Sequence, residues 1–401
     1  MRLTHQSISA LGLFLAAANA SAQSFMSLGV PDDALASYPA GISADGTTVV
    51  GTYTASGNAS RAFRWTSAGG FEDLGTLTGE TGTALGLAID ADGTTAAGWS
   101  NNFSQKGFVW TAPGPMIEIP SLPGGQDSSS AQGISDDGVV VVGFAWSEDA
   151  SAEPFRWTPG TGIVGLGFLP DPGSFPQGQS RAANADGSIV VGEASANFNQ
   201  RLAFRWTESE GMVSLGDLPG GQAFSGAYAV TADGSVVVGF SSSTSGFEAF
   251  RWTEADGMVG IGDAPGGNFS SIAYDVSDDG TVIVGESDTA NGSEAFVWTA
   301  GTGVQPLREV LTGYGIDLTG WTLRDAQGIS ADGRTIVGDG INPMGMQVGW
   351  IATIPPQACS IADVTTTGGT LPGQPGFGIP DARIDLDDLG FFLNVWLLGC
   401  D

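Results

Sequence analysis

The chain has 401 residues, of which 13 are Lys or Arg and 43 are Asp or Glu, so its formal net charge is −30. Such an acidic chain is repelled by nucleic acids and by anionic membrane surfaces, and neither is an expected partner. Charged residues make up only 14% of the chain and hydrophobic residues 41%, which predicts a folded protein, while 63 glycines indicate many tight turns.

The first 22 residues have the pattern of a secretory signal peptide. Arg2 gives a short basic start, residues 8–17 form an apolar run, and Ala20-Ser21-Ala22 fits a cleavage site of small residues. We expect a secreted or extracellular protein, associated with the cell surface and without a membrane span, since the apolar run is about half the ~20 residues that a span needs. The only histidine, His5, lies in this leader, so an enzyme of the mature chain would have to use carboxylates.

Two phrases recur seven times along the rest of the chain, at a period near 47 residues. The first has the form Gly-Ile-Ser-Ala-Asp-Gly followed by Val-Val-Gly, and its aspartates are Asp45, Asp92, Asp137, Asp186, Asp233, Asp279 and Asp332. The second has the form Ala-Phe-Arg-Trp-Thr, and its tryptophans are Trp65, Trp110, Trp157, Trp206, Trp252, Trp298 and Trp350. A third, apolar phrase ending in Leu-Gly first occurs at 25–29, ahead of the first aspartate, and does not occur after Trp350.

One repeat predicts four short strands, at 228–231, 235–240, 249–253 and 258–262. The Asp-Gly pair between the first two predicts a tight mirror-image hairpin turn, since such turns need positive φ. Four strands at this period predict an all-β, seven-bladed β-propeller of four-stranded blades over residues 23–354. We expect the N-terminal strand at 25–29 to complete the seventh blade and close the ring, with an open solenoid as the alternative.

These phrases resemble the HAF family of extracellular repeat proteins. Units of that family carry Gly-Ile-Ser-x-Asp-Gly, Val-Val-Gly, Ala-Phe-Arg-Trp and Leu-Gly-x-Leu-Pro-Gly-Gly, and the resemblance covers residues 25 to about 353. It implies an extracellular repeat protein and no particular activity.

The repeated polar residues are expected to be structural. The aspartates are expected to form turns at blade ends, each apart from the next. At the arginine position of the second phrase, Arg64, Arg156, Arg205 and Arg251 alternate with Val109 and Val297. A position that accepts either residue type predicts a packing surface between blades, where an arginine stem lies along its neighbours and its head meets a carboxylate. The tryptophans are expected in the core.

Ligand binding is expected instead in the segments that join the second and third strands, which vary most between copies. These are 52–60, 99–106, 145–153, 193–202, 240–248, 286–294 and 339–347. They are polar, and four isolated aromatic residues, Tyr53, Phe103, Trp146 and Phe198, are the candidate ligand rim on one face. The alternative is a solvated loop face without a ligand.

The composition changes after residue 355, where residues 355–401 are expected to form a small module. Cys359 and Cys400 bracket it, which predicts a disulfide in a secreted chain. Asp385 is a suitable N-cap for a helix over 386–398. That helix is too apolar to stay uncovered, so we expect it to dock on a partner protein or on the propeller.

This segment resembles the GC-type dockerin-like modules at the C-termini of secreted bacterial proteins. The resemblance implies a calcium site, with Asp381, Asp385 and Asp388 at loop positions five, nine and twelve and Asp363 offering the first ligand. The alternative is a capped, disulfide-closed helix without metal. No other cofactor is expected.

These observations predict an exported, non-enzymatic repeat protein that acts as a surface binding or scaffold module and docks through its C-terminal segment. The expected partner is a surface protein or a carbohydrate. The alternatives are a polysaccharide hydrolase or lyase that uses paired carboxylates on a propeller, and a purely structural surface material.

Overall fold

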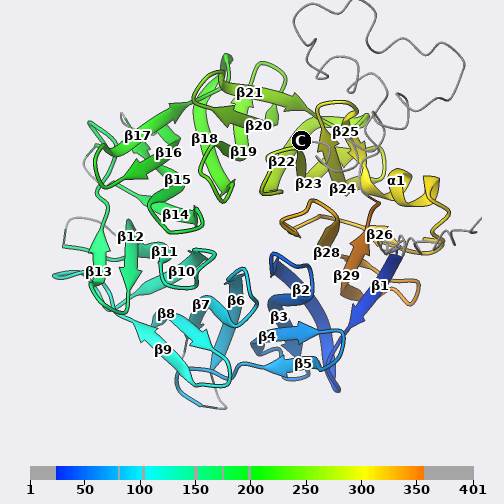
Figure 1. Ribbon diagram of the computed structural model, residues 1–401, viewed down its shortest axis with the longest axis horizontal. Helices are drawn as coiled ribbons and strands as arrows, with labels where there is room; N and C mark the ends of the chain where they lie inside the picture. The colour runs from blue at the N-terminus through cyan, green and yellow to red at the C-terminus, as the bar shows by residue number, and fades with distance from the viewer. Residues whose placement is uncertain are drawn as a thin grey trace, which may run out of the picture. The chain divides into compact units, whose positions relative to one another are not determined.

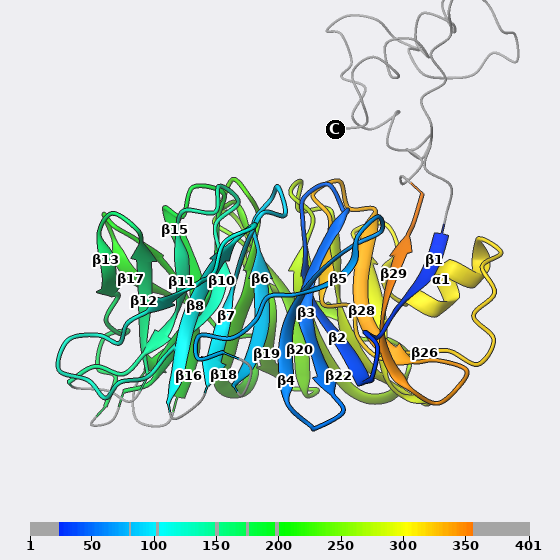
Figure 2. The ribbon, with the colours of Figure 1, turned by 90° about the horizontal axis from the view of Figure 1, so that it is seen from below.

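The computed structural model describes residues 24–355, except 80–81, 102–103, 149–151, 174–175 and 197–199. In this part of the chain the backbone forms seven antiparallel units, numbered here 1 to 7. Parallel residue pairs, Arg201 with Phe224 and Phe247 with Ser270, join units 4, 5 and 6 into one larger sheet. Figure 1 shows the units side by side around a common axis, and Figure 2 shows their strands running between the two faces. Four-stranded sheets in this arrangement resemble the blades of a β-propeller.

In units 1 to 6 the four strands pair in chain order, from the innermost to the outermost. Units 1 to 3 comprise β2 (Ala34–Ile42), β3 (Thr48–Ala55), β4 (Ser60–Thr66) and β5 (Gly70–Asp73); β6 (Thr83–Ile89), β7 (Thr95–Asn101), β8 (Gln105–Thr111) and β9 (Met116–Ile119); and β10 (Ser129–Ile134), β11 (Val141–Ala145), β12 (Glu153–Thr158) and β13 (Gly162–Gly165). Units 4 to 6 comprise β14 (Gly178–Ala183), β15 (Ile189–Ala196), β16 (Gln200–Thr207) and β17 (Gly211–Gly216); β18 (Gly220–Val230), β19 (Val236–Ser243), β20 (Phe247–Thr253) and β21 (Gly257–Gly262); and β22 (Gly266–Val276), β23 (Val282–Thr289), β24 (Gly292–Thr299) and β25 (Gly303–Pro306). The four strands predicted at 228–262 correspond to β18–β21 and are confirmed.

Unit 7 combines the two ends of the described chain. Its inner strand is split into β26 (Thr322–Leu323) and β27 (Gly328–Ile329), both paired with β28 (Thr335–Ile341). The next strand is β29 (Gln347–Thr353), and β1 (Ser24–Gly29) pairs antiparallel with it. The outermost strand of this sheet therefore comes from the N-terminal end.

A fully buried aromatic side chain lies at the same register position of every third strand, opposite a glycine of the second strand. These residues are Phe63, Phe108, Phe155, Phe204, Phe250, Phe296 and Trp350. The glycine is needed because the bulged inner strand comes very close: a Cβ on Gly239 would lie 2.0 Å from the carbonyl oxygen of Gly226. The predicted alignment was wrong in the last copy, since Trp350 takes the place of the phenylalanine and Ala352 that of the tryptophan.

The turn between the first and second strands is not the two-residue mirror-image turn that the Asp-Gly pair predicted. In unit 5 the Gly234 amide donates to the Thr231 carbonyl and the Thr231 amide to the Val236 carbonyl, so four residues connect the strands. Only Gly234 has a positive φ, of +75°, and Asp233 keeps an ordinary conformation. Its carboxylate accepts hydrogen bonds from the Ser235 amide at 2.8 Å and the Thr231 hydroxyl at 2.7 Å.

The longest repeat contains an insertion that the sequence analysis did not interpret. Helix α1 (Leu307–Gly313) follows β25 and buries Leu307 and Leu311 in the core that units 6 and 7 share. The segment after it brings Trp321 against Phe25 of β1, with ring centroids 5.0 Å apart. The insertion therefore covers the place where β1 joins the sheet.

No helix in residues 24–355, within the described ranges, is long and apolar enough to cross a membrane. The predicted signal peptide (1–22) and all of the predicted C-terminal module except Pro355 lie outside the described residues.

Candidate functional site

The repeated polar side chains hold the fold together. In all seven units the side chain two residues before the repeated aspartate accepts a hydrogen bond from the first amide of the second strand, for example Ser43 from Thr48 at 3.0 Å. The expectation that the aspartates are turn formers is confirmed, as Asp45 accepts bonds from the Ser43 hydroxyl and the Thr47 amide.

The turns that carry the aspartates are joined to one another through their backbones, whereas the aspartate carboxylates bond within their own turns, as Asp45 does to Ser43 and Thr47. Backbone hydrogen bonds join the turns of neighbouring units. Five of them link the residues just before the aspartates: Ala44 to Ala91, Ala91 to Asp136, Ala185 to Ala232, Asp278 to Ala331 and Ala331 to Ala44. Between units 3 and 4 the amide of Asp137 itself donates to the Ala185 carbonyl. These residues form a collar around the axis at one face, where the inner strands end and their turns come close enough for these bonds.

Two of the four repeated arginines, Arg64 and Arg156, bond to the neighbouring unit, as predicted. Arg64 of unit 1 donates from Nε to the Gly93 carbonyl of the unit 2 turn at 2.7 Å, and its guanidinium lies 3.5 Å from Glu72. Arg156 of unit 3 makes the same bond to the Gly187 carbonyl of unit 4 at 3.0 Å. These side chains therefore fasten neighbouring units.

The residues on the axis differ in chemical type from one copy of the repeat to the next. Six inner strands carry a β-bulge at one repeat position, and Gln327 takes the corresponding place ahead of β27. A bulge re-aims the extra side chain, and all seven such residues line a cavity of about 210 Å³ on the axis. They are Ala40, Leu87, Gln132, Arg181, Tyr228, Tyr274 and Gln327.

The cavity is layered along the axis. Next to the bulge residues lies an apolar belt of Ile42, Ile89, Ile134, Ala183, Val230, Val276 and Ile329. The collar follows, and it carries alanine in five units but Asp136 in unit 3 and Asp278 in unit 6, both exposed at the mouth of the cavity. In the described part of the chain neither carboxylate accepts a hydrogen bond or forms an ion pair.

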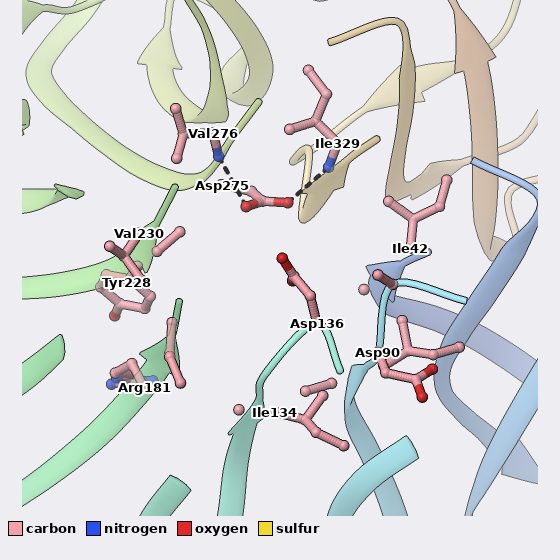
Figure 3. Close-up of a pocket in the computed structure, with 18 of the residues that line it drawn as sticks. Ile42, Asp90, Ile134, Asp136, Arg181, Tyr228, Val230, Asp275, Val276 and Ile329 are labelled. Carbon is pink, nitrogen blue, oxygen red and sulfur yellow. Dashed lines mark hydrogen bonds between the residues drawn. The ribbon is translucent and has the colours of Figure 1, made fainter. Parts of the chain in front are cut away.

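A third carboxylate lies nearby at a position where the other six units have glycine or alanine. Asp275 accepts hydrogen bonds from the amides of Val276 and Ile329, both at 2.9 Å, and Figure 3 shows Asp136 pointing toward it. Burial, more than the charges of Asp278 and Asp136, raises the pKa of Asp275 to about 7. At the cavity mouth, partial loss of solvation by the surrounding residues also raises the pKa of Asp136, although its side chain is exposed, and the charge of Asp278 adds to the effect.

Aromatic and cationic side chains meet in the bulge layer. The Arg181 guanidinium carbon lies 4.5 Å from the centre of the Tyr228 ring, which contacts Tyr274 edge to face at 5.5 Å. Arg181 also lies 3.4 Å from the buried carboxylate of Glu193. Burial, with the charge of nearby Glu286, raises the pKa of Tyr274, so its hydroxyl stays protonated.

Unit 7 adds a second carboxylate pair near this layer. The Asp339 amide donates to Asp325 Oδ1 at 3.0 Å. Burial raises the pKa of Asp325 to about 8, with contributions from its hydrogen bond to the Asp339 carboxylate and from that charge. At neutral pH the pair therefore holds one proton.

The predicted rim is only partly described. Tyr53 lies half-buried in β3, where its hydroxyl donates to Asp73 at 2.9 Å, and burial with this bond raises its pKa to about 12. Trp146 follows β11, and its amide donates to the Ser128 carbonyl. Phe103 and Phe198 lie outside the described residues. The joining segments are shorter than predicted, because β3 to Ala55 and β4 from Ser60 take most of the first one.

The remaining predicted site residues cannot be placed, since Cys359, Cys400, Asp363, Asp381, Asp385 and Asp388 are all outside the described ranges. Among residues 24–355, within those ranges, no group of three or more His, Cys, Asp and Glu side chains is arranged to hold a metal ion. The sequence analysis missed the axial residues because it compared loops. Comparing the inner strands of the seven copies would have shown Arg181, Tyr228 and Tyr274 where the first copy has Ala40.

No protein-family model and no curated protein matches the chain. Among solved structures it is similar to a prolyl endopeptidase, with a TM-score of 0.51 and 13% identity over 81% of this chain and 51% of that one. It is also similar to prolyl oligopeptidase B from Galerina marginata (TM-score 0.50, 8% identity, 76% of this chain and 47% of that one). A match to TolB from Acinetobacter baumannii has a TM-score of 0.43 and 13% identity over 63% of this chain and 61% of that one.

These likenesses concern the fold alone, and they support a β-propeller-like arrangement of the sheets. The chain spans about half the length of the prolyl peptidases that it matches.

Proposed function

We propose that this chain is an exported, non-enzymatic binding protein built on a closed seven-bladed β-propeller, which its C-terminal segment docks at the cell surface. In this proposal residues 1–22 are removed on export and residues 355–401 form the dockerin-like module. The resemblance of the repeats to the HAF family of extracellular proteins supports export, and the partner is a carbohydrate or a protein of the surface.

Contacts between the first and last units support closure of the ring. The Ser37 hydroxyl of unit 1 donates to the Gly29 carbonyl of β1 at 2.6 Å and accepts the Gly349 amide of β29 at 2.9 Å. The collar bond from Ala331 to Ala44 joins the same two units at the axis. A closed ring has no open sheet edge to recruit other chains.

The binding function rests on one observation, the chemical variety of the seven bulge residues at one geometric position. A scaffold needs none of this variety, since Ala40 is sufficient in the first copy. Five polar or aromatic side chains have instead been placed around one half-open cavity, the arrangement typical of ligand sites. The repeated side chains, by contrast, already form hydrogen bonds: the aspartates within their turns, and Arg64 and Arg156 to the next unit.

The alternative function is a carboxylate-dependent polysaccharide hydrolase or lyase, and one observation favours it. Such enzymes need a carboxyl group with a raised pKa as general acid and a second carboxylate as partner. Asp275 and Asp136 face one another in the cavity and both have raised pKa values. Against this role, both oxygens of Asp275 already accept backbone amides.

Incubation of residues 23–401 with isolated envelope polysaccharides distinguishes the two functions. Retention of the protein is measured by its depletion from solution, and turnover by new reducing ends and by unsaturated products. Our proposal predicts retention without products. Products that disappear in Asp136→Asn/Asp275→Asn, but persist when the exposed Glu208 and Glu309 are changed to Ala, would assign the enzyme instead.

A further inference from the structure

We infer that the axial cavity binds an aliphatic ammonium group, with the nitrogen at the acidic mouth and the hydrocarbon chain along the apolar belt. This deepens the proposed binding function and rests on it. The geometry behind it is the sequence of layers on the axis: carboxylates, then branched aliphatic side chains, then amides and tyrosines.

The carboxylates at the mouth of the cavity determine the sign of the ligand's charge. Asp136 and Asp278 stand where the other five units have alanine, and they have no hydrogen-bond or ion-pair partner within the described ranges. Asp275 adds a third carboxylate beside them, and its position is glycine or alanine elsewhere in the repeat. The one cation among the lining residues, Arg181, lies in the bulge layer and forms an ion pair with Glu193, which Arg201 also contacts. The three carboxylates therefore outnumber the cations of the cavity. The mouth therefore favours a cation.

The apolar belt determines which chemical group is attached to the cationic nitrogen. Of the six branched aliphatic side chains of the belt, Ile42, Ile89 and Val230 are half-buried and keep part of their surface accessible, whereas the other three are buried in the hydrophobic cores between units. A hydrated metal ion or a sugar ring would find neither ligands nor hydrogen bonds on the three accessible side chains. An alkyl chain gains free energy there for every methylene that it buries. At the far end, Gln132, Gln327 and the two tyrosines offer hydrogen bonds to a second polar end group.

Titration calorimetry of the full chain with methylamine, butylamine and cadaverine tests this inference. Affinity should rise about fourfold for each added methylene that the belt buries. Pentanediol, which is neutral, should bind at least tenfold more weakly than cadaverine. Gly-Lys-Gly distinguishes the source of the ammonium: tighter binding of this peptide indicates a lysine side chain of a protein partner, and tighter binding of cadaverine indicates a free amine.

The variant Asp136→Ala/Asp278→Ala restores the alanine of the other units, so the fold should tolerate it. We expect it to lose at least about tenfold in amine affinity, as should Asp136→Asn/Asp278→Asn. Glu208→Ala/Glu309→Ala removes two exposed charges outside the cavity and should bind as the parent does.

The inference is overturned if no amine binds, if pentanediol binds as well as cadaverine, if affinity does not depend on chain length, or if the axial variants keep full affinity. Envelope retention that persists when the amines fail would leave the binding function standing with a different ligand. Loss of both would reject the function itself.

Discussion

Gly187 shows why glycine follows the aspartate in every repeat: this position needs a positive φ, and it leaves no room for a Cβ atom. Its φ is +66°, and a Cβ there would lie 2.4 Å from Cβ of Val140 in the preceding unit. Gly211, in an outer turn, has a similar φ of +70°, but a Cβ there would have no other atom within 4 Å. A comparison of Gly187 with Gly211 therefore separates the cost of a positive φ from the cost of a clash between units.

Gly211→Ala should therefore lower the free energy of unfolding by about 1 kcal/mol, the cost of a left-handed non-glycine residue. Gly187→Ala should cost about 2 to 4 kcal/mol, because overpacking against Val140 adds to the same strain. Denaturant unfolding of both variants measures the difference. Equal losses would show that the turns do not fasten the units.

The pair Asp325 and Asp339 predicts a stability that falls with rising pH. The pKa of Asp325 is raised to about 8 in the folded chain, so the folded state binds more protons than the unfolded state between about pH 4 and 8, and stability is lost across that range. Asp325→Asn imitates the protonated acid and should flatten this decline, so that the variant is the more stable protein at pH 8.

Thermal unfolding at a series of pH values measures this effect. Asp171→Asn, on an exposed turn with a φ that asparagine accepts, is the matched control and should follow the parent. A parallel decline in the parent and in Asp325→Asn would mean that the pair does not hold the proton.

At the scale of single residues, the internal repeat was a reliable guide where the copies agree. It identified the turn aspartates because all seven copies carry them, and the arginines between units because valine replaces arginine in some copies, as a packing position allows. It could not give the turn conformation, since Asp-Gly fits two hairpin types and the choice depends on the collar contacts of neighbouring units. It also could not show that Trp350 replaces a phenylalanine, because only strand register reveals that shift.

Strand β1 is the element on which the proposed closure depends, and its Phe25 packs against two tryptophans. The Phe25 ring lies 5.0 Å from Trp321 and 6.1 Å from Trp350. Phe25→Ala should lower the free energy of unfolding by about 2 kcal/mol, toward the lower end for a half-buried aromatic residue. Met26→Ala, on the same strand and 44% exposed, should change it by less than about 0.5 kcal/mol.

Chemical denaturation of the two variants gives the comparison. If Phe25→Ala and Met26→Ala lower the free energy of unfolding by the same small amount, the packing of β1 does not stabilise the proposed ring closure.

Elements with their own turn signals were predictable from the sequence, as β18 to β21 show. Helix α1 was not, although the 53 residues between Asp279 and Asp332 marked an insertion. Its seven residues have no capping side chain, and the burial of Leu307 and Leu311 against units 6 and 7 fixes them. The bulges were equally hidden, because strand periodicity does not report an extra residue that only the partner strand reveals.

At the scale of the whole molecule, the repeated residues build the fold, and residues that differ between the copies line the cavity where we propose the binding site. The sequence analysis expected the ligand at the rim, whereas the structure brings the non-repeating inner-strand residues together on the axis. Their common location depends on seven units meeting at one place, which no single repeat encodes. With a formal charge of −30, the whole molecule also attracts cations toward the acidic mouth.

The most direct test of the central claim, that this is a binding protein docked by its C-terminal segment, is a binding isotherm on isolated cell envelopes. It compares residues 23–401 with a chain that ends at Pro355, which keeps the buried Ile354 in the core that units 6 and 7 share. We predict saturable binding of the full chain and at least tenfold weaker binding of the shortened one. Equal binding of both chains, or no binding of either, would contradict this claim.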